Sequence, residues 1–215
     1  MCGGTYRGWE YPRQLVKING EAIVARTIRL LREHGVDDIA ISSNNPWFEE
    51  FGVPVLRHTN NYKMNKYNDY DGYWFECFYP TDEPVCYVFG DVVFSPEAIS
   101  TIVNTETDDI ELFGSAPPFA PNYAKTHVEP FALKVVNTEH LKQAIEKSKQ
   151  LDAEGKFWRK PIMWELWTVI KGVKLQTVPD EYEYNYTIIN DYTCDVDRKK
   201  DVQKIEQIMK RIWNE

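Results

Sequence analysis

The chain has 215 residues, and its 25 Lys and Arg against 33 Asp and Glu give a formal net charge of −8. This acidic balance argues against nonspecific binding to a nucleic acid polymer, which needs a surplus of basic side chains. A content of 43% hydrophobic and 14% aromatic residues excludes a disordered chain and indicates a globular protein. The length fits a single domain over residues 1–215.

Targeting and redox features predict a cytoplasmic protein. No apolar run approaches the ~18 residues of a membrane span, so we expect no membrane association. The opening residues MCGGTYRGWEYPRQ lack the apolar stretch of a signal peptide. The four cysteines are scattered without a CxxC pair, which predicts reduced thiols.

The elements of the first half are predicted to alternate between helices and strands. A Gly-rich loop over residues 1–13 is followed by a short apolar piece, Leu15–Ile18. Apolar periodicity, caps and breakers then predict a helix over 23–33, a strand over 38–42, a short helix over 46–51, strands over 53–56 and 85–89, and a helix from Ser95-Pro96 to Val103. The continuous apolar run over 85–89 is typical of a parallel strand covered on both faces.

The second half is more mixed. We predict strands over 109–113 and 131–136, helices over 138–151 and 158–170, a strand over 174–178, and an amphipathic helix over 197–213. The alternation in the first half indicates an α/β protein with a mostly parallel sheet.

The N-terminal loop is the first candidate for an anion site. Residues 1–35 hold three acidic and six basic side chains, so they carry +3 while the rest of the chain carries −11. In Gly3-Gly4-Thr5-Tyr6-Arg7 the glycines allow the backbone to approach a phosphate closely, and Arg7 and Arg13 offer forked hydrogen bonds to it. A plain surface turn is the alternative, and the loop is not a P-loop because GxxxxGK[ST] is absent.

Acidic residues after a predicted strand and before the last predicted helix are candidates for a metal site. Asp91 directly follows the apolar strand, at the edge of an α/β sheet where ligands bind, and its carboxylate suits Mg²⁺. The alternative is a turn residue that bonds its own loop. Asp195 and Asp197 alternate before the last helix, so only one of them need face a site, and Asp197 could instead be the helix N-cap.

An aromatic cluster near residues 157–167 could enclose a cationic or sugar-like substrate, although core packing is the favoured interpretation. It comprises Phe157, Trp158, Trp164 and Trp167, with Arg159 and Glu165 beside them. The histidines lack HExxH spacing and no GxSxG occurs, so zinc and hydrolase chemistry have little support.

Three blocks of the chain, in order, resemble the nucleotidyltransferase family with a GT-A-like fold, whose members transfer NMP from an NTP to a phosphorylated acceptor. The blocks are GGTYRGWEYPRQLVKINGEAIVARTIRLLREHGVDDIAIS, YVFGDVVFSPEAI and CDVDRKKDVQKIEQIM. The resemblance extends to phosphocholine cytidylyltransferases and sugar-1-phosphate nucleotidyltransferases. It implies a three-layer, Rossmann-like fold with a mixed, mostly parallel sheet, and a division into a nucleotide-binding half (1–110), an acceptor-binding half (111–193) and a tail with a metal ligand (194–215).

The resemblance also implies roles for individual residues. The NTP phosphates would lie on Gly3, Gly4 and Thr5, with Arg7 on the β- and γ-phosphates. Arg13 stands where the family has Lys, on the α-phosphate, and keeps the charge with a different geometry. Asp91 and Asp197 match the paired carboxylates that hold Mg²⁺.

We expect the base, with CTP or UTP favoured as the NTP, near the strand ends at Ser42 to Asn44 and near Asn68 to Gly72. The phosphorylated small-molecule acceptor is expected against residues 120–135 and 157–167, with Trp158, Trp164, Glu165 and Lys134 as its candidate contacts. A homodimer is compatible with the sequence. Two alternatives stay open, a GT-A glycosyltransferase that uses Asp195-Val196-Asp197 as a DxD motif and a nucleotide-binding module without catalysis.

One departure from the family pattern concerns the start of the chain. The family's first strand precedes the Gly loop, whereas only Met1 and Cys2 precede Gly3 here. We therefore expect this strand to be truncated and the natural start codon to lie upstream of Met1.

Overall fold

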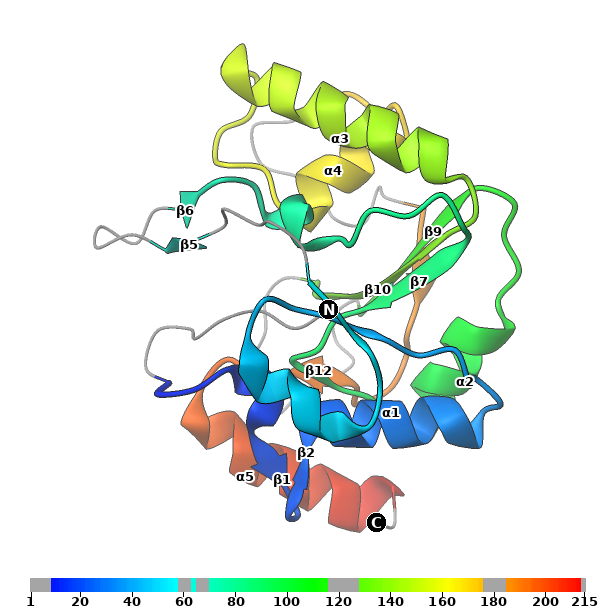
Figure 1. Cartoon of the computed structure of the whole chain (residues 1–215), viewed down its shortest axis with the longest axis vertical. Helices are drawn as coiled ribbons and strands as arrows, with labels where there is room; N and C mark the ends of the chain where they lie inside the picture. Colours follow the sequence, from blue (N-terminus) through cyan, green and yellow to red (C-terminus); the bar gives the residue numbers. More distant parts are fainter. Residues whose placement is uncertain (1–8, 58–62, 65–69, 116–127, 176–184, 214–215) are drawn as a thin grey trace.

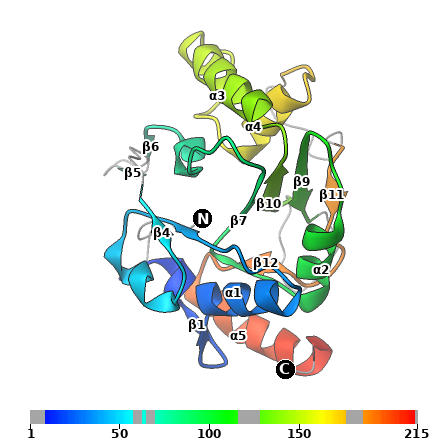
Figure 2. The same ribbon diagram turned by 45° about the vertical axis from the view of Figure 1, so that its right-hand side comes forward.

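The computed structural model describes residues 9–57, 63–64, 70–115, 128–175 and 185–213. Its main sheet has four strands, β7 (Val85–Val88), β9 (Ile110–Gly114), β10 (Pro130–Val135) and β11 (Thr187–Ile188), in the order β11-β9-β10-β7. Helices lie on both sides of this sheet, α3 and α4 on one side and α1, α2 and α5 on the other (Figures 1 and 2). The protein is therefore of mixed α/β class, as predicted.

The prediction of a mostly parallel sheet is wrong for the described strands. In the main sheet β10 runs antiparallel to both β7 and β9, and only β11 runs parallel to its neighbour β9. The apolar run of β7 is misleading because cysteine counts as apolar, yet Cys86 is exposed while Tyr87 is buried. The strand is thus less covered at Cys86 than at Tyr87, which an antiparallel sheet permits.

The remaining described strands form two-residue pairs outside the main sheet. The pair β3 (Ile41–Ser42) with β4 (Val55–Leu56) is parallel. The antiparallel pairs are β1 (Lys17–Ile18) with β2 (Glu21–Ala22), β5 (Lys63–Met64) with β6 (Tyr70–Asp71), and β8 (Val92–Val93) with β12 (Cys194–Asp195). Met1 to Gly4 and residues 176–178 lie outside the described residues, so the predictions of a truncated first strand and of a strand over 174–178 are not resolved there.

Most predicted helices are confirmed. The α-helices are α1 (Ile23–Glu33), α2 (Pro96–Asn104), α3 (Thr138–Ala153), α4 (Met163–Ile170) and α5 (Lys199–Ile208), which a π-helical turn extends over Met209–Trp213. Short 3₁₀ helices are also present among the described residues, namely η1 (Arg13–Leu15), η2 (Pro46–Phe51) and η3 (Trp74–Cys77). Side-chain caps explain two of the starts, since Ser95 accepts from the Ala98 amide and Asn137 from the His140 amide. No α-helix within the described ranges is long and apolar enough to cross a membrane.

The helix predicted over 158–170 begins only at Met163. Pro161 disfavours helical backbone at Lys160 before it, and Ile162 is extended, with φ −117° and ψ −158°. The Glu165 carboxylate accepts from the Ile162 amide at 3.0 Å, which satisfies a donor at the helix start. Local proline chemistry therefore overrides the aromatic periodicity of this segment.

A second apolar cluster brings the two ends of the chain together. It is separate from the main core around the four-stranded sheet, and it consists of Val16, Ile18, Ile23, Val93, Cys194, Val196, Ile205, Ile208 and Met209. These residues come from the segment between η1 and α1, the first position of α1, β8, β12 with the turn after it, and the C-terminal helix. Their packing places η1 beside the turn that follows β12, although the two are more than 180 positions apart in sequence.

Gly114 is a position where the fold requires the absence of a side chain. A Cβ built there would lie 2.7 Å from the backbone oxygen of Glu129, where β9 meets β10. We expect Gly114→Ala to lower the free energy of unfolding by about 1–3 kcal/mol, because backbone atoms must move. Urea denaturation measures it. Gly20→Ala is a comparison in which the Cβ meets open space and the positive φ alone costs about 1–3 kcal/mol; an unchanged free energy of unfolding in Gly114→Ala would contradict the expectation.

Candidate functional site

Arg13 connects three distant segments of the chain. Its guanidinium donates from Nη2 to Asp91 Oδ2 at 2.5 Å and from Nη1 to Asp197 Oδ1 at 2.6 Å. Nη1 also donates to the carbonyl of Val196 at 3.1 Å. Arg13 belongs to η1, Asp91 to the turn after β7, and Asp197 to the turn between β12 and α5. The structure thus brings together Arg13, which the family resemblance assigns to the α-phosphate, and the two aspartates that it assigns to the metal.

Arg13, Asp91 and Asp197 form a group, called the Arg13 cluster below, that is partly shielded from solvent. The side chain of Arg13 is 15% exposed, that of Asp91 21% and that of Asp197 39%. Burial by itself would lower the pKa of Arg13, but the nearby carboxylates of Asp91, Asp197 and Asp195 outweigh it and raise this pKa above its ordinary value. Arg13 is therefore a permanent positive charge, and the site is organised around it.

Neither aspartate has the structural role that was the alternative interpretation. The carboxylate of Asp91 bonds across 78 positions to Arg13 rather than to its own turn. The N-cap of α5 is Arg198, not Asp197. The buried Asp201 carboxylate accepts from the Asp197 amide at 3.2 Å and from the Arg198 amide at 2.7 Å. This cap sets the backbone of Asp197 and leaves its carboxylate available to Arg13.

Backbone contacts hold the two aspartate turns side by side. The Val196 amide donates to the Asp91 carbonyl at 3.0 Å, next to the β8–β12 pair. On the other side, the indole Nε1 of Trp9 donates to the Asp197 carbonyl at 3.1 Å. Trp9 and Arg13 therefore attach the end of the N-terminal loop to the turn before α5 at two points.

An acidic group beside Arg13 could hold a metal ion. Glu129, Asp195 and Asp197 each offer a carboxylate oxygen, and these atoms lie within 4.8 Å of one another. Both Asp195 and Asp197 belong to this group, although their alternation in the sequence required only one of them to face a site. Oxygen ligands of this kind suit a hard divalent cation without selecting Mg²⁺ over others. Asp91 is not a member of the group.

Glu129 is a residue that reasoning from the sequence did not identify. It directly precedes β10, and hydrogen bonds with Ser115 fix its backbone: the Ser115 amide donates to the Glu129 carbonyl at 2.9 Å, and the Glu129 amide donates to Ser115 Oγ at 3.1 Å. No spacing in the sequence links it to Asp195, which is 66 positions away. Only an acid at the start of a predicted strand could have drawn attention to it.

Several predicted nucleotide contacts lie outside the described residues, namely Gly3, Gly4, Thr5, Arg7 and Asn68. Of the others, Ser42 is buried at the end of β3 and its Oγ donates to the Cys77 carbonyl at 3.2 Å. Asn44 is exposed, and its carbonyl accepts from Arg57 at 3.0 Å. Neither of these hydrogen bonds involves Arg13, Asp91 or Asp197.

The residues predicted to contact an acceptor differ in exposure. Trp164 is 3% exposed, and its ring packs against Tyr186 with centroids 5.5 Å apart. Glu165 is equally buried and pairs with Arg159 at 2.7 Å. Only Trp158, at 51%, presents a large surface to solvent, with the Arg159 guanidinium 4.8 Å from its ring centre. Core packing thus accounts for Trp164, and polar contacts with Arg159 and the Ile162 amide account for Glu165. Trp158 with Arg159 remains as an exposed aromatic surface.

The contacts of Lys134 are with backbone carbonyls at the end of a helix. Its ammonium donates to the carbonyls of Val103 and Thr105, at 3.1 and 2.6 Å, where α2 ends. We expect Lys134→Met to lower the free energy of unfolding by about 1–2 kcal/mol, because two charge-assisted hydrogen bonds to a helix end are lost. Thermal unfolding measures it. An unchanged stability together with a raised KM for a phosphorylated acceptor would show that Lys134 serves the substrate instead.

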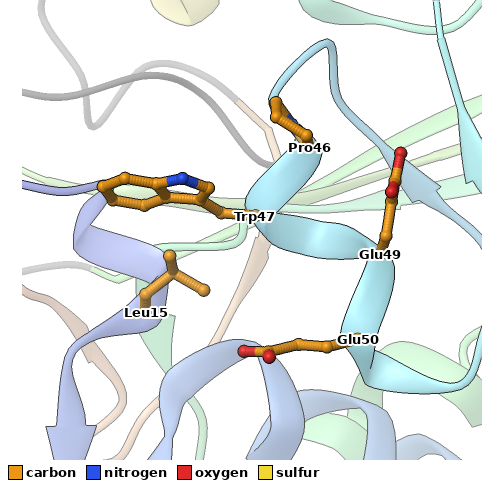
Figure 3. A pocket seen from close by; sticks show the side chains of 5 residues that line it. All are labelled: Leu15, Pro46, Trp47, Glu49 and Glu50. Carbon is orange, nitrogen blue, oxygen red and sulfur yellow. The ribbon is translucent and has the colours of Figure 1, made fainter.

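A separate cavity of about 480 Å³ lies between η1 and η2. Figure 3 shows its lining residues, Leu15, Pro46, Trp47, Glu49 and Glu50, with the Trp47 indole beside Leu15. Trp47 is 51% exposed, and Glu49 is paired with Arg57 outside the cavity. None of the residues of the Arg13 cluster lines this cavity.

The comparisons with known proteins leave the site to be judged on its own geometry. No protein-family model matches the chain, and no curated protein matches it significantly.

Proposed function

We propose that the protein is a Mg²⁺-dependent nucleotidyltransferase that moves NMP from an NTP to a phosphorylated small molecule and releases pyrophosphate. The observation that carries the proposal is the position of Arg13, between Asp91 and Asp197. These residues come from three separate sequence blocks, each of which resembles a block of the same family. The mixed sheet with helices on both sides is compatible with the GT-A-like, Rossmann-like architecture that the proposal includes.

The proposed reaction depends on neutralisation of phosphate charge and on positioning of the substrates, and it does not depend on proton transfer. An acceptor phosphate oxygen attacks the α-phosphorus in line, forms the new P–O bond and expels pyrophosphate. Because this oxygen is already an anion, no general base is required. Arg13 would neutralise charge on the α-phosphate as the pentavalent transition state forms, and Arg7 would do so on the leaving phosphates.

Carboxylates present in the site fit a divalent cation. Asp91 and Asp197 are the proposed ligands, and Asp195 and Glu129 lie close enough to Asp197 to contribute or to orient it. The donor set consists entirely of carboxylate oxygens, which hard cations prefer. A bound Mg²⁺ would supply charge neutralisation between phosphate oxygens.

The substrates follow the family resemblance. CTP or UTP is the favoured nucleotide, with Ser42, Asn44 and Asn68 proposed near the base. The acceptor is a sugar-1-phosphate, phosphocholine or a similar small molecule, and the exposed Trp158 is its most accessible candidate contact. We propose that the enzyme acts in the cytoplasm.

Pyrophosphate release tests the proposal. The full chain is incubated with Mg²⁺ and each of the four NTPs, in combination with phosphocholine or several sugar-1-phosphates, and pyrophosphate is measured. Release that requires both an NTP and an acceptor supports the proposal. Binding of NTP without turnover across the acceptors would contradict it and favour a nucleotide-binding module.

One observation favours a second candidate, a GT-A glycosyltransferase. Asp195 and Asp197 share one acidic group, as the carboxylates of a DxD motif would on a nucleotide-sugar diphosphate. The same preparations are incubated with UDP-sugars and Mn²⁺. Release of UDP without any pyrophosphate release from NTPs would assign the site to this activity.

A further inference from the structure

Arg13 occupies the position between the two carboxylates that the proposed function assigns to a divalent cation. Its two terminal nitrogens bond one oxygen of each, Asp91 Oδ2 and Asp197 Oδ1. We propose that Arg13 is an internal counter-cation of this pair, so that a divalent cation binds there only together with a polyphosphate that draws the guanidinium away. The inference rests on the proposed function for the identity of the two carboxylates as metal ligands.

Competition between the guanidinium and a metal ion follows from the contacts. The guanidinium occupies one oxygen of each carboxylate, and it would be a like charge within a few ångströms of any ion bound to the pair in this partly buried site. With 15% of its side chain exposed, Arg13 is weakly screened by water. An ion that approaches Asp91 and Asp197 while Arg13 remains between them would lose ligand oxygens and meet a like charge.

A polyphosphate offers Arg13 an equivalent partner. Phosphate oxygens accept the same paired hydrogen bonds from a guanidinium as two carboxylates do. Transfer of Arg13 to phosphate would release Asp91 Oδ2 and Asp197 Oδ1 for the cation that accompanies the phosphates. The Val196 carbonyl, which also accepts from Nη1, lies on the backbone of the same turn and would keep the arginine near the site during this exchange.

A direct test measures Mn²⁺ binding to the full chain without nucleotide, by electron paramagnetic resonance of the free ion. We expect Arg13→Met to bind Mn²⁺ at least about tenfold more tightly than the unmodified protein, because a competing charge is removed. Arg29→Met is the matched control, since Arg29 also bridges two carboxylates, Glu21 at 2.9 Å and Glu33 at 3.0 Å, on the surface. It should leave Mn²⁺ binding unchanged.

A second comparison locates the ion. Asp197→Asn in the Arg13→Met background should return Mn²⁺ binding to the weak level of the unmodified protein. If Arg13→Met fails to fold by circular dichroism, Arg13→Gln decides, because its neutral amide can still donate to one carboxylate and should tighten Mn²⁺ binding by removing the competing charge. Equal Mn²⁺ affinity in the unmodified protein and the Arg13 variant, or tight binding that persists without Asp197, would overturn the inference.

Addition of inorganic tripolyphosphate completes the experiment. Water proton relaxation should report little bound Mn²⁺ in the unmodified protein alone and a strong enhancement once tripolyphosphate is present. Enhancement of the same size without tripolyphosphate would also overturn the inference. None of these readouts uses turnover, so the absence of pyrophosphate release would refute the proposed function and leave the competition between Arg13 and Mn²⁺ to be decided separately.

Discussion

Asp91→Asn is expected to reduce nucleotide-dependent pyrophosphate release by about 10²- to 10³-fold, since the change removes a charge at the centre of the proposed site. Asparagine has nearly the same shape as aspartate, and its amide oxygen can still accept from Arg13. Asp197 and the Val196 carbonyl continue to hold the guanidinium. We therefore expect a cost of only about 1–3 kcal/mol in the free energy of unfolding.

Steady-state kinetics and urea denaturation of the same variant separate the two effects. Asp109→Asn is the matched control, because Asp109 also pairs with a basic side chain, His140 at 2.8 Å, but lies away from the Arg13 cluster. Its turnover should equal that of the unmodified protein. Near-normal turnover in Asp91→Asn would refute the metal assignment, and a large loss of stability would make Asp91 primarily a structural partner of Arg13.

Trp167→Ala is expected to have the largest effect on stability, a loss of about 3–5 kcal/mol in the free energy of unfolding. Trp167 lies in α4, is fully buried, and belongs to the main core between this helix and the four-stranded sheet. Its replacement leaves a cavity that the surrounding close-packed side chains cannot fill completely. Urea denaturation followed by circular dichroism measures the change.

Trp167→Phe separates the loss of volume from the loss of the indole N–H. The Nε1 of Trp167 is buried and has no hydrogen-bond partner among the described residues. Phenylalanine keeps much of the ring and removes this unpaired donor, whose burial is itself costly. We expect Trp167→Phe to cost less than half as much as Trp167→Ala; equal losses in the two variants would show that the N–H has a stabilising partner.

The helices could be predicted from the sequence where their ends are coded locally. Ser95 followed by Pro96 starts α2, and apolar periodicity places α1 over the predicted residues. The start of α4 could not be predicted from aromatic spacing, because proline at 161 sets the backbone before it. The direction of β7 could not be predicted either, because its sequence is apolar throughout although Cys86 is exposed and the strand is antiparallel to β10.

The acidic residues of the candidate site were only partly accessible from sequence. Asp91 was predicted from its place after an apolar strand, and Asp197 from the family resemblance. Glu129 could not be predicted, because its proximity to Asp195 depends on how β10 and β12 are placed in space. Conversely, Lys134 and Glu165 fitted an acceptor site by composition, whereas Lys134 bonds the end of α2, and Glu165 bonds Arg159 and the start of α4.

The sequence by itself determined an acidic α/β chain with a basic N-terminal segment, because charge content and apolar periodicity are properties of neighbouring residues. Only the tertiary structure decided that Arg13 lies between Asp91 and Asp197. That contact depends on the second apolar cluster, which packs the segment after η1 against β12 and α5. The functional group of each residue is given by the sequence, but the electrostatic field that acts on it comes from residues that packing brings from elsewhere in the chain.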